Sequence, residues 1–426
     1  MGGGGAPAPL NKVKRLLLLA TTTGYQTRAF GEAAARLGID LVFATDRCHV
    51  LEDPWFDRAI PIRFFDESGS AQAIIEAART MPLDGVLAVG DRPTVIAALV
   101  AQALRLPGHP PEAAAVARHK QLTRERLRES GLPVPWFVPT SIDADPRALA
   151  SSVAFPCVIK PVALSGSRGV MRADDEPSFV AAFERVRALL LSPEVRAERN
   201  DAHSLALVEE FIPGREYALE GLMHHGVFHV VALFDKPDPL DGPFFEETIY
   251  VTPSTAAPGV QQAIRGAIGA AAAAIGLRHG PIHAECRVNA QGVFVLEVAA
   301  RPIGGLCARV IPGLEELLLR HACGESPDVW KRDANASGVM MIPIPRRGVF
   351  REVAGVDDAR RVPGIVDVQI TAKPDQLLVP LPEGASYLGF IFARGDAPSA
   401  VTEALRDAHS RMNFAIDPEL RVVASG

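Results

Sequence analysis

Cysteine is scarce in this sequence, and no two cysteines have the spacing that a disulfide pair or a metal site requires. The 426 residues include five cysteines, an odd number, scattered from Cys48 to Cys323 without a C-x-x-C pair. Disulfide frameworks and structural zinc sites both need clustered or evenly paired cysteines. The sequence therefore predicts reduced thiols.

An excess of positive charge and long hydrophobic runs are also lacking. The 44 Lys and Arg residues against 50 Asp and Glu give a net charge of −6 with no basic block, whereas nucleic-acid-binding proteins present a clustered basic face. The apolar stretches Val95 to Leu104 and Ala267 to Leu277 are too short to cross a bilayer, and Leu16 to Ala20 is too short for a signal peptide. We expect no nucleic-acid partner, no membrane span and a cytoplasmic location.

Several common catalytic fingerprints are missing as well. The chain contains no G-x-G-x-x-G dinucleotide fingerprint, no G-x-x-x-x-G-K-[ST] phosphate loop and no G-x-S-x-G nucleophile elbow. Any phosphate bound by this protein must therefore be held by a few placed cations and backbone amides. Chemistry based on a serine or cysteine nucleophile is not indicated.

The first hundred residues alternate between strand-like and helix-like patterns. Val13 to Ala20 and Asp40 to Ala44 are strand-like, Thr27 to Leu37 is helical, and the alternation continues to Leu104. This rhythm predicts a doubly wound α/β domain, in which ligands bind at the strand ends. Candidates there are Thr22, Gly24, Gly90 and Asp91, although ordinary turn residues would have the same pattern.

Composition divides the chain into four parts. Residues 1–10, rich in glycine, are expected to be disordered, and 11–111 form the N-terminal α/β domain. A central domain spans 112–330 and begins with a helix from Glu112 to Ser130 that has Lys120 in its middle. Residues 331–426 are predicted to form a smaller C-terminal α+β lid. The fold class is thus α/β and α+β multidomain.

Pro281 to Gly305 is the most informative stretch, because it predicts a β-hairpin that carries two glutamates. If Ala290, Gln291 and Gly292 form a three-residue loop, Glu285 lies directly opposite Glu297. Two carboxylates that face each other destabilise a strand pair unless a cation lies between them. The alternative is a solvated hairpin with a two-residue loop, which would place the two glutamates on opposite faces.

Lys160 ends another apolar strand and is followed by a loop that contains glycine and serine. The backbone amides of such a loop can approach a polyphosphate closely, and Gly166 and Gly169 make that approach easier. A plain hairpin connection would have the same composition. The loop consists of Ala163, Leu164, Ser165, Gly166, Ser167, Arg168 and Gly169.

Taken in order, these charged residues resemble the ATP-grasp superfamily. The resemblance covers about Lys120 to Gly305 and rests on Lys120, Lys160 with its loop, Glu209-Glu210-Phe211-Ile212, Glu216, Glu285, Glu297 and Arg301. The flanking regions also resemble the preceding α/β domain and the following lid of carboxylate–amine ligases in that superfamily. The stretch Glu297 to Gly305, EVAARPIGG, is similar to the E-x-x-x-R-x-x-G-G of L-amino-acid ligases, which make dipeptides.

The resemblance implies a role for each of these residues. Lys120, Lys160 and the loop from Ser165 to Gly169 would bind the phosphates of ATP, and Glu209, Glu210, Phe211 and Ile212 would form the hinge strand that pairs with adenine. Glu216 would hold the ribose, and Glu285 and Glu297 would bind Mg²⁺, with Mn²⁺ as an alternative ion. Arg301 would clamp the acyl phosphate, and Gly304 and Gly305 would present amides to the same charge.

One position departs from the superfamily pattern. Many ATP-grasp enzymes carry an asparagine two residues after the second metal-binding glutamate, and Ala299 stands there in this chain, so the number of metal ions stays open. His283 shares the hairpin face with Glu285 and is either a catalytic residue or an ordinary strand histidine. Lys236 and Glu247 flank a loop rich in proline and glycine, and are either site residues or solvated loop residues.

The predicted function is that of an ATP-dependent ligase. The γ-phosphate of ATP would pass to a substrate carboxylate, and an amine would attack the resulting acyl phosphate to form an amide, releasing ADP and phosphate. The alternatives are an ATP-grasp carboxylase, a kinase-like phosphotransferase and a nucleotide-binding module without turnover. We expect small-molecule carboxylate and amine substrates, whose identities the sequence does not specify, and a homodimer is a common outcome for such enzymes.

Overall fold

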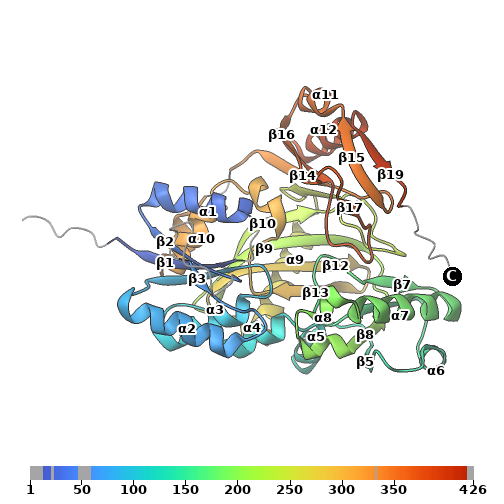
Figure 1. Cartoon of the computed structure of the whole chain (residues 1–426), viewed down its shortest axis with the longest axis horizontal. Coiled ribbons are helices and arrows are strands. Elements are labelled where there is room, and N and C mark those ends of the chain that lie inside the picture. The colour runs from blue at the N-terminus through green and yellow to red at the C-terminus, as the bar shows by residue number, and fades with distance from the viewer. Residues whose placement is uncertain (1–12, 21–23, 47–58, 332, 420–426) are drawn as a thin grey trace, which may run out of the picture.

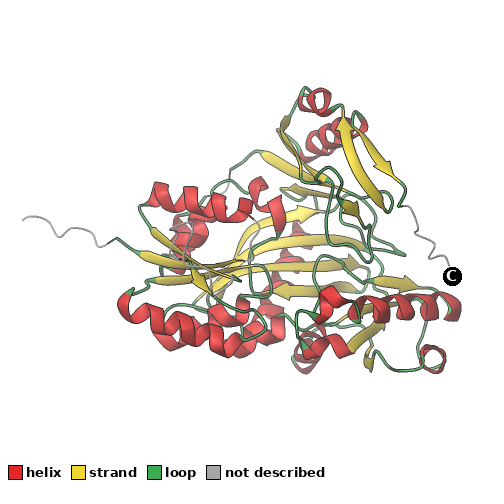
Figure 2. Ribbon diagram, viewed as in Figure 1, coloured by secondary structure: helices red, strands yellow, loops and turns green. Residues whose placement is uncertain are grey.

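The computed structural model describes residues 13–20, 24–46, 59–331 and 333–419. Figure 1 shows an N-terminal α/β part, a central part built on a long sheet, and a C-terminal part above one end of that sheet. Figure 2 shows that helices cover the strands of each part. The predicted multidomain α/β and α+β class is therefore confirmed.

The N-terminal part is a parallel four-stranded sheet with the order β3-β2-β1-β4. Its central strand β1 carries the run Leu16 to Leu19, which is fully buried, because helices cover both faces of a parallel sheet. The elements are β1 (Arg15–Ala20), α1 (Gly24–Leu37), β2 (Asp40–Thr45), β3 (Ile60–Pro61), α2 (Glu67–Thr80), β4 (Gly85–Val89) and α3 (Thr94–Leu104). The predicted strands at β1 and β2 and the predicted helix at α1 are confirmed.

Two helices stand where one was predicted between Glu112 and Ser130. They are α4 (Pro111–Ala117) and α5 (Lys120–Glu129). His119 is extended between them, and its side chain accepts a hydrogen bond from the backbone N–H of Leu122, which caps α5. The prediction of Lys120 in mid-helix was therefore wrong, and Lys120 is the first residue of α5.

A small antiparallel sheet with the order β5-β8-β6-β7 follows. Its elements are β5 (Phe137–Ser141), α6 (Pro146–Ala150), β6 (Cys157–Pro161), β7 (Met171–Ala173), α7 (Glu176–Leu190), α8 (Pro193–Arg196), η1 (Asp201–Ser204) and β8 (Leu205–Glu210). Helix α7 packs on this sheet through Phe179 and Phe183, which are buried. Lys160 lies in β6 and Glu209 in β8, and these two strands are neighbours.

The long sheet is antiparallel and has eight strands in the order β13-β12-β9-β10-β11-β14-β18-β16. The elements of its central half and the helices after it are β9 (Arg215–His224), β10 (Val227–Asp235), β11 (Ile249–Thr252), α9 (Pro258–Ile275), β12 (Gly280–Asn289), β13 (Gly292–Ala299), η2 (Gly305–Val310), α10 (Leu314–Ala322) and η3 (Pro327–Val329). The site residues of this half come mainly from β9, β10 and β12.

The C-terminal part supplies the other end of the long sheet and a second, three-stranded sheet, β17-β15-β19. Its elements are β14 (Ala336–Ile342), β15 (Gly348–Ala354), α11 (Val356–Arg360), β16 (Ile365–Ile370), β17 (Leu377–Leu378), β18 (Gly389–Gly395), α12 (Pro398–Ser410) and β19 (Asn413–Asp417). Because β11 pairs with β14, the C-terminal part shares a continuous sheet with the central part. The domain boundaries stay predictions, and residues 1–10 lie outside the described residues.

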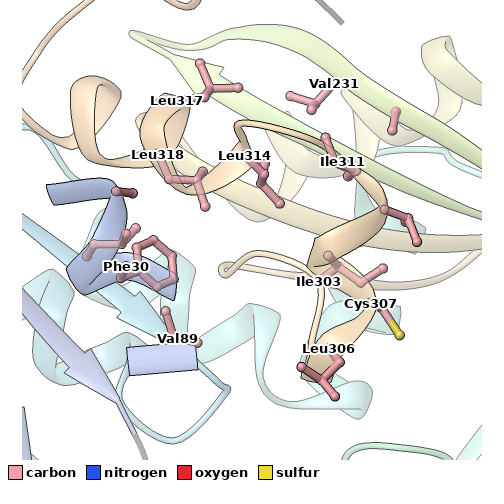
Figure 3. Close-up of a cluster of buried hydrophobic side chains, with 14 of the residues drawn as sticks. Phe30, Val89, Val231, Ile303, Leu306, Cys307, Ile311, Leu314, Leu317 and Leu318 are labelled. Carbon is pink, nitrogen blue, oxygen red and sulfur yellow. The ribbon is translucent and has the colours of Figure 1, made fainter. Parts of the chain in front are cut away.

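A buried core joins the N-terminal part to the segment that follows β13. Figure 3 shows Phe30 of α1 and Val89 of β4 on one side, with Leu314 and Leu318 of α10 and Ile303 close by. All five belong to one cluster of buried side chains. This packing holds the end of the predicted site against the N-terminal domain. In the described part of the chain, no helix is both long and apolar enough to span a bilayer.

Candidate functional site

The hairpin β12–β13 pairs Glu285 with Glu297, as predicted, but by a different route. Asn289 pairs with Gly292, so the loop has two residues and the predicted three-residue loop was wrong. The register then shifts between Glu285 and Cys286, which leaves Leu296 as the extra residue of a β-bulge. The bulge restores the pairing that a regular hairpin with a two-residue loop would lose.

Arg124 of α5 explains how the bulge is held. Its Nη1 donates to the carbonyl oxygens of Val295 and Leu296 at 3.1 and 3.0 Å. Its Nε donates to the Glu209 carboxylate at 2.9 Å, and its side chain is fully buried. One guanidinium thus connects α5, β8 and the bulge in β13. The sequence analysis missed Arg124, for which the only signal was an arginine one turn after Lys120 on the same helix.

Glu209 lies between two cations, because Lys160 also donates to its carboxylate. Burial alone would raise the pKa of Glu209, but Arg124 and Lys160 lower it to about 2. For Lys160, burial and the Arg124 charge outweigh the attraction of Glu209 and lower the pKa to about 8. The Glu209 carboxylate is therefore already bonded to Arg124 and Lys160, while the side chain of Glu210 is exposed to solvent. The adenine contacts expected of this strand stay a prediction.

The loop after Lys160 contains three residues with left-handed backbone conformation. Gly166, Ser167 and Gly169 all have positive φ, at 64°, 55° and 74°, and open space surrounds the α-carbon of Gly166. The Nζ of Lys120 donates to the carbonyl of Leu164 at 2.6 Å, which places that ammonium beside the loop. The predicted phosphate residues Lys120, Gly166, Ser167 and Gly169 are thus brought together.

Arg168 is directed elsewhere. It bonds the carboxylate of Glu194 at 3.1 Å and the carbonyl of Glu383 at 2.9 Å, while the backbone N–H of Gly169 donates to the carbonyl of Pro382 at 2.7 Å. The loop is therefore attached to the C-terminal part. To bind phosphate, the Arg168 side chain would have to give up its hydrogen bonds to Glu194 and Glu383.

Lys236, directly after β10, is surrounded by three carboxylates. Its Nζ lies 2.7 Å from Glu216, 2.6 Å from Glu247 and 2.8 Å from Glu285. The hydroxyl of Tyr250 donates to Glu285 at 3.0 Å. Burial opposes every charge here, but the three glutamates hold the pKa of Lys236 well above its usual range, and Lys236 and His283 hold that of Glu285 well below. Burial and Glu285 raise the pKa of Glu247 to about 7.

The same carboxylates have the donor chemistry of a site for a hard divalent cation. One oxygen each from Glu216, Glu247 and Glu285 lies within 4.8 Å of the others, and an all-oxygen set suits Mg²⁺ or Mn²⁺. Glu297, the other predicted ligand, lies 3.7 Å from Lys120. Each predicted metal-binding glutamate is thus paired with a lysine. The residues present fit the ion, provided that it displaces Lys236 or shares the carboxylates with it.

Arg301 is held in place by the N-terminal domain. Its Nε and Nη2 bond the two oxygens of Asp91 at 2.8 and 3.2 Å, and both side chains are largely buried. The pair keeps the pKa of Asp91 below its usual value although burial alone would raise it. Gly304 and Gly305 stand at the start of η2, and the carbonyl of Gly305 accepts a hydrogen bond from Gln26.

Asp91 was expected on the substrate side of the N-terminal sheet, and it now has a specific partner. Thr22, another candidate there, lies outside the described residues. Gly24 is the first residue of α1. Gly90 has a φ of 93°, a backbone conformation that residues with a side chain rarely adopt.

His283 bonds a fully buried glutamate that the sequence analysis did not single out. Its Nδ1 lies 3.2 Å from Glu220, which also accepts from the backbone N–H of Ile303 at 3.0 Å. Burial opposes the charge of His283, but the bonds to Glu220 and Glu285 raise its pKa to about 9. Ala299, which stands where many ATP-grasp enzymes have an asparagine, pairs with His283 across the hairpin. The available signal was a glutamate inside the apolar strand that starts at Glu216.

Comparison with known proteins finds three families that match this chain. The ATP-grasp N-terminal domain family matches residues 31–108, the ATP-grasp domain family 153–310, and the L-amino acid ligase C-terminal domain 2 family 340–417. The crystal structure of L-amino acid ligase from Bacillus licheniformis is 25% identical, with a TM-score of 0.80, and the match covers 96% of this chain and all of that one.

Two curated relatives have similar identity. An uncharacterised protein, y4rH, from Sinorhizobium fredii is 25% identical over 96% of this chain and 85% of its own length. Alanine–anticapsin ligase from Bacillus subtilis is 26% identical over 59% of this chain and 54% of its own length. The chain therefore spans only about half of that ligase.

Proposed function

The chain belongs to the ATP-grasp superfamily and is a carboxylate–amine ligase close to the L-amino-acid ligases, and we propose that it joins two amino-acid-like substrates through an acyl phosphate. In the first step, a carboxylate oxygen of one substrate attacks the γ-phosphorus of ATP and ADP leaves. In the second, the amine of the other substrate attacks the acyl carbon, phosphate leaves, and the amine loses a proton as the amide forms.

One observation carries the proposal: four buried or half-buried cations from four different segments meet carboxylates around the hairpin β12–β13. They are Lys120, Lys160, Lys236 and Arg301, and each is paired with a carboxylate. Acyl-phosphate chemistry needs such charges to position and neutralise phosphate oxygens. Within the described ranges, burial raises the pKa of the Cys157 and Cys307 thiols to about 12, which does not suit a nucleophile.

Each residue then has a defined part. Lys120, Lys160 and the amides of the loop from Ser165 to Gly169 bind the phosphates, and Glu216 and the strand from Glu209 to Ile212 bind the nucleoside. Arg301 orients the carboxylate that becomes the acyl phosphate, with the amides of Gly304 and Gly305 beside it. His283 and Lys236 contribute positive charge near that substrate.

Glu285 and Glu297 would hold Mg²⁺, with Glu247 as a further oxygen donor that the resemblance did not name. When bound, the ion supplies positive charge to the phosphate oxygens. In the free protein Lys236 and His283 keep the pKa of Glu285 well below its usual value although burial opposes this, and Lys120 lies 3.7 Å from Glu297. The number of ions and a homodimeric assembly stay predictions.

The test uses purified protein, ATP, Mg²⁺ and pairs of amino acids, with the first amino acid labelled with ¹⁸O in its carboxylate. An acyl phosphate transfers one labelled oxygen to the released phosphate, so we expect ADP, labelled phosphate and an amide of the summed mass. Chelation of the ion should stop all three. AMP with pyrophosphate, or amide formation with unlabelled phosphate, would refute the route.

A further inference from the structure

A group of histidines lies outside the site described above, where three segments of the chain meet. His224 ends β9, His225 lies in the turn before β10, His279 directly precedes β12, and His321 lies in α10. One ring nitrogen each from His224, His225 and His279 lies within 4.8 Å of the others. We call these three residues, with His321 behind them, the histidine cluster.

The clearest sign of a ligand is the ring of His279. Its Nε2 lies 3.2 Å from the backbone carbonyl of His321, and because a carbonyl only accepts, Nε2 carries the hydrogen. The Nδ1 atom is therefore a bare lone pair, and it is buried without a hydrogen-bond partner among the described residues. The side chain is only 4% exposed. A metal-binding imidazole has this same arrangement, with the opposite nitrogen donating to a carbonyl.

A second buried histidine nearby shows the contrast. His109 accepts from the backbone N–H of Arg278 through Nδ1 and lies 3.2 Å from the carbonyl of Pro281 through Nε2. Both of its nitrogens are used, as expected for a histidine with a purely structural role. The open Nδ1 of His279 is thus a specific feature and not a general property of this region.

The other members of the cluster are held in place around the ring of His279. The Nδ1 of His224 lies 3.2 Å from the Nε2 of His321, and the rings of His279 and His321 stack with centroids 4.1 Å apart. The backbone N–H of Gly226 donates to the carbonyl of Arg278 at 2.7 Å, which fixes the turn against the residue before His279. His225 is exposed, so an ion can enter from solvent.

We propose that His224, His225 and His279 bind one transition-metal ion of the Zn²⁺ type, with water completing its coordination. Imidazole nitrogen suits Zn²⁺, Co²⁺, Ni²⁺ and Cu²⁺, whereas Mg²⁺ prefers the oxygen donors around Lys236. The two sites therefore select different ions. Burial also lowers the pKa of His279 to about 4, so its ring is neutral and available at neutral pH.

The ion would have a structural role. It would tie the β9–β10 turn to the start of β12, the strand that carries His283 and Glu285. Its absence should cost thermal stability and leave the chemistry at Lys236 and Arg301 intact. This inference does not depend on the ligase mechanism and can fail or succeed separately from it.

The test uses the full chain without a histidine tag, with Mg²⁺ in excess to occupy the oxygen site. Titration with Co²⁺ should give visible ligand-field bands that saturate at one ion per chain, and Zn²⁺ should abolish the bands and raise the melting temperature. His225→Ala and His279→Ala should each weaken Co²⁺ binding at least about tenfold, and His321→Gln about 10–100-fold through lost positioning. His409→Ala, in α12, is the matched control and should bind as the wild type does.

Because His225 is exposed, its substitution tests the site without endangering the fold. His225→Ala should keep the Mg²⁺-dependent turnover of the wild type while losing the Zn²⁺-dependent gain in melting temperature. Absence of Co²⁺ bands in the wild type would overturn the proposal. So would unchanged Co²⁺ affinity in both His225→Ala and His279→Ala, since the ion would then be bound elsewhere.

Discussion

Arg301 and Asp91 form a two-point ion pair across 210 positions of sequence. Asp91 follows strand β4 of the N-terminal domain, and Arg301 follows strand β13 of the central sheet. The pair sets the direction of a guanidinium whose planar fork suits a carboxylate or phosphate. If Arg301 acts as proposed, the N-terminal part helps to build the reaction site and does not merely flank it.

Asp91→Asn should keep the shape of this contact and remove its charge. Arg301 would then be a largely buried cation without a counter-ion, so we expect a loss of about 3 kcal/mol in the free energy of unfolding and about 10²-fold in kcat from misplacement. Urea unfolding and steady-state kinetics measure the two effects. Asp40→Asn is the control, because its pair with Arg15 is more exposed and should cost less than about 1 kcal/mol. Equal effects of the two substitutions would contradict the assignment.

Lys160 gives a pH dependence to ATP binding. Its pKa is lowered to about 8 in the free protein, so the ammonium is charged below that pH and increasingly neutral above it. If Lys160 binds phosphate, ATP binding above about pH 8 must take up a proton, and the Kd for ATP should rise by up to about tenfold per pH unit.

Isothermal titration calorimetry in two buffers of different ionisation enthalpy measures this proton uptake directly. Lys160→Arg stays charged throughout and should show no uptake and a flatter Kd profile. Proton release by the wild type, or a Kd that does not change between about pH 7 and pH 9, would show that Lys160 is not a phosphate ligand.

Arg124 should be the most sensitive position of helix α5 because its buried guanidinium serves Glu209 and the bulge at once. Arg124→Ala leaves Glu209 with only Lys160 and two carbonyls without a donor, so a cost of about 3–5 kcal/mol is expected. Arg128→Ala, on the exposed face of the same helix, should cost under about 1 kcal/mol. Chemical denaturation of both variants measures the change in the free energy of unfolding. A small loss of stability in Arg124→Ala would show that the bulge forms without this arginine.

The limits of the sequence analysis follow from the same contacts. The strand β1 was predictable because four leucines in a row need cover on both faces, and the hairpin β12–β13 because residue types mark its turn. The bulge at Leu296 was not, since it depends on a guanidinium from a helix about 170 residues away. The pairing of β11 with β14 was missed for a similar reason, because long-range register leaves no local pattern.

The glutamates around Lys236 can bind either the lysine or a divalent ion, and a substitution of Lys236 separates these two interactions. In the free protein its ammonium lies within 2.8 Å of Glu216, Glu247 and Glu285, in the region where a divalent ion would bind. Lys236→Met removes that competitor and leaves excess negative charge. The affinity of the free protein for Mn²⁺ should therefore increase at least about tenfold.

Ligase turnover of the same variant should fall, because Lys236 also supplies charge near the substrate. Electron paramagnetic resonance of Mn²⁺ measures the affinity, and Lys373→Met, an exposed lysine, is the control. Circular dichroism confirms that the variant is folded. If Mn²⁺ affinity falls instead of rising, then Lys236 organises the carboxylates for the ion and does not compete with it, and both charges must then be present together during the reaction.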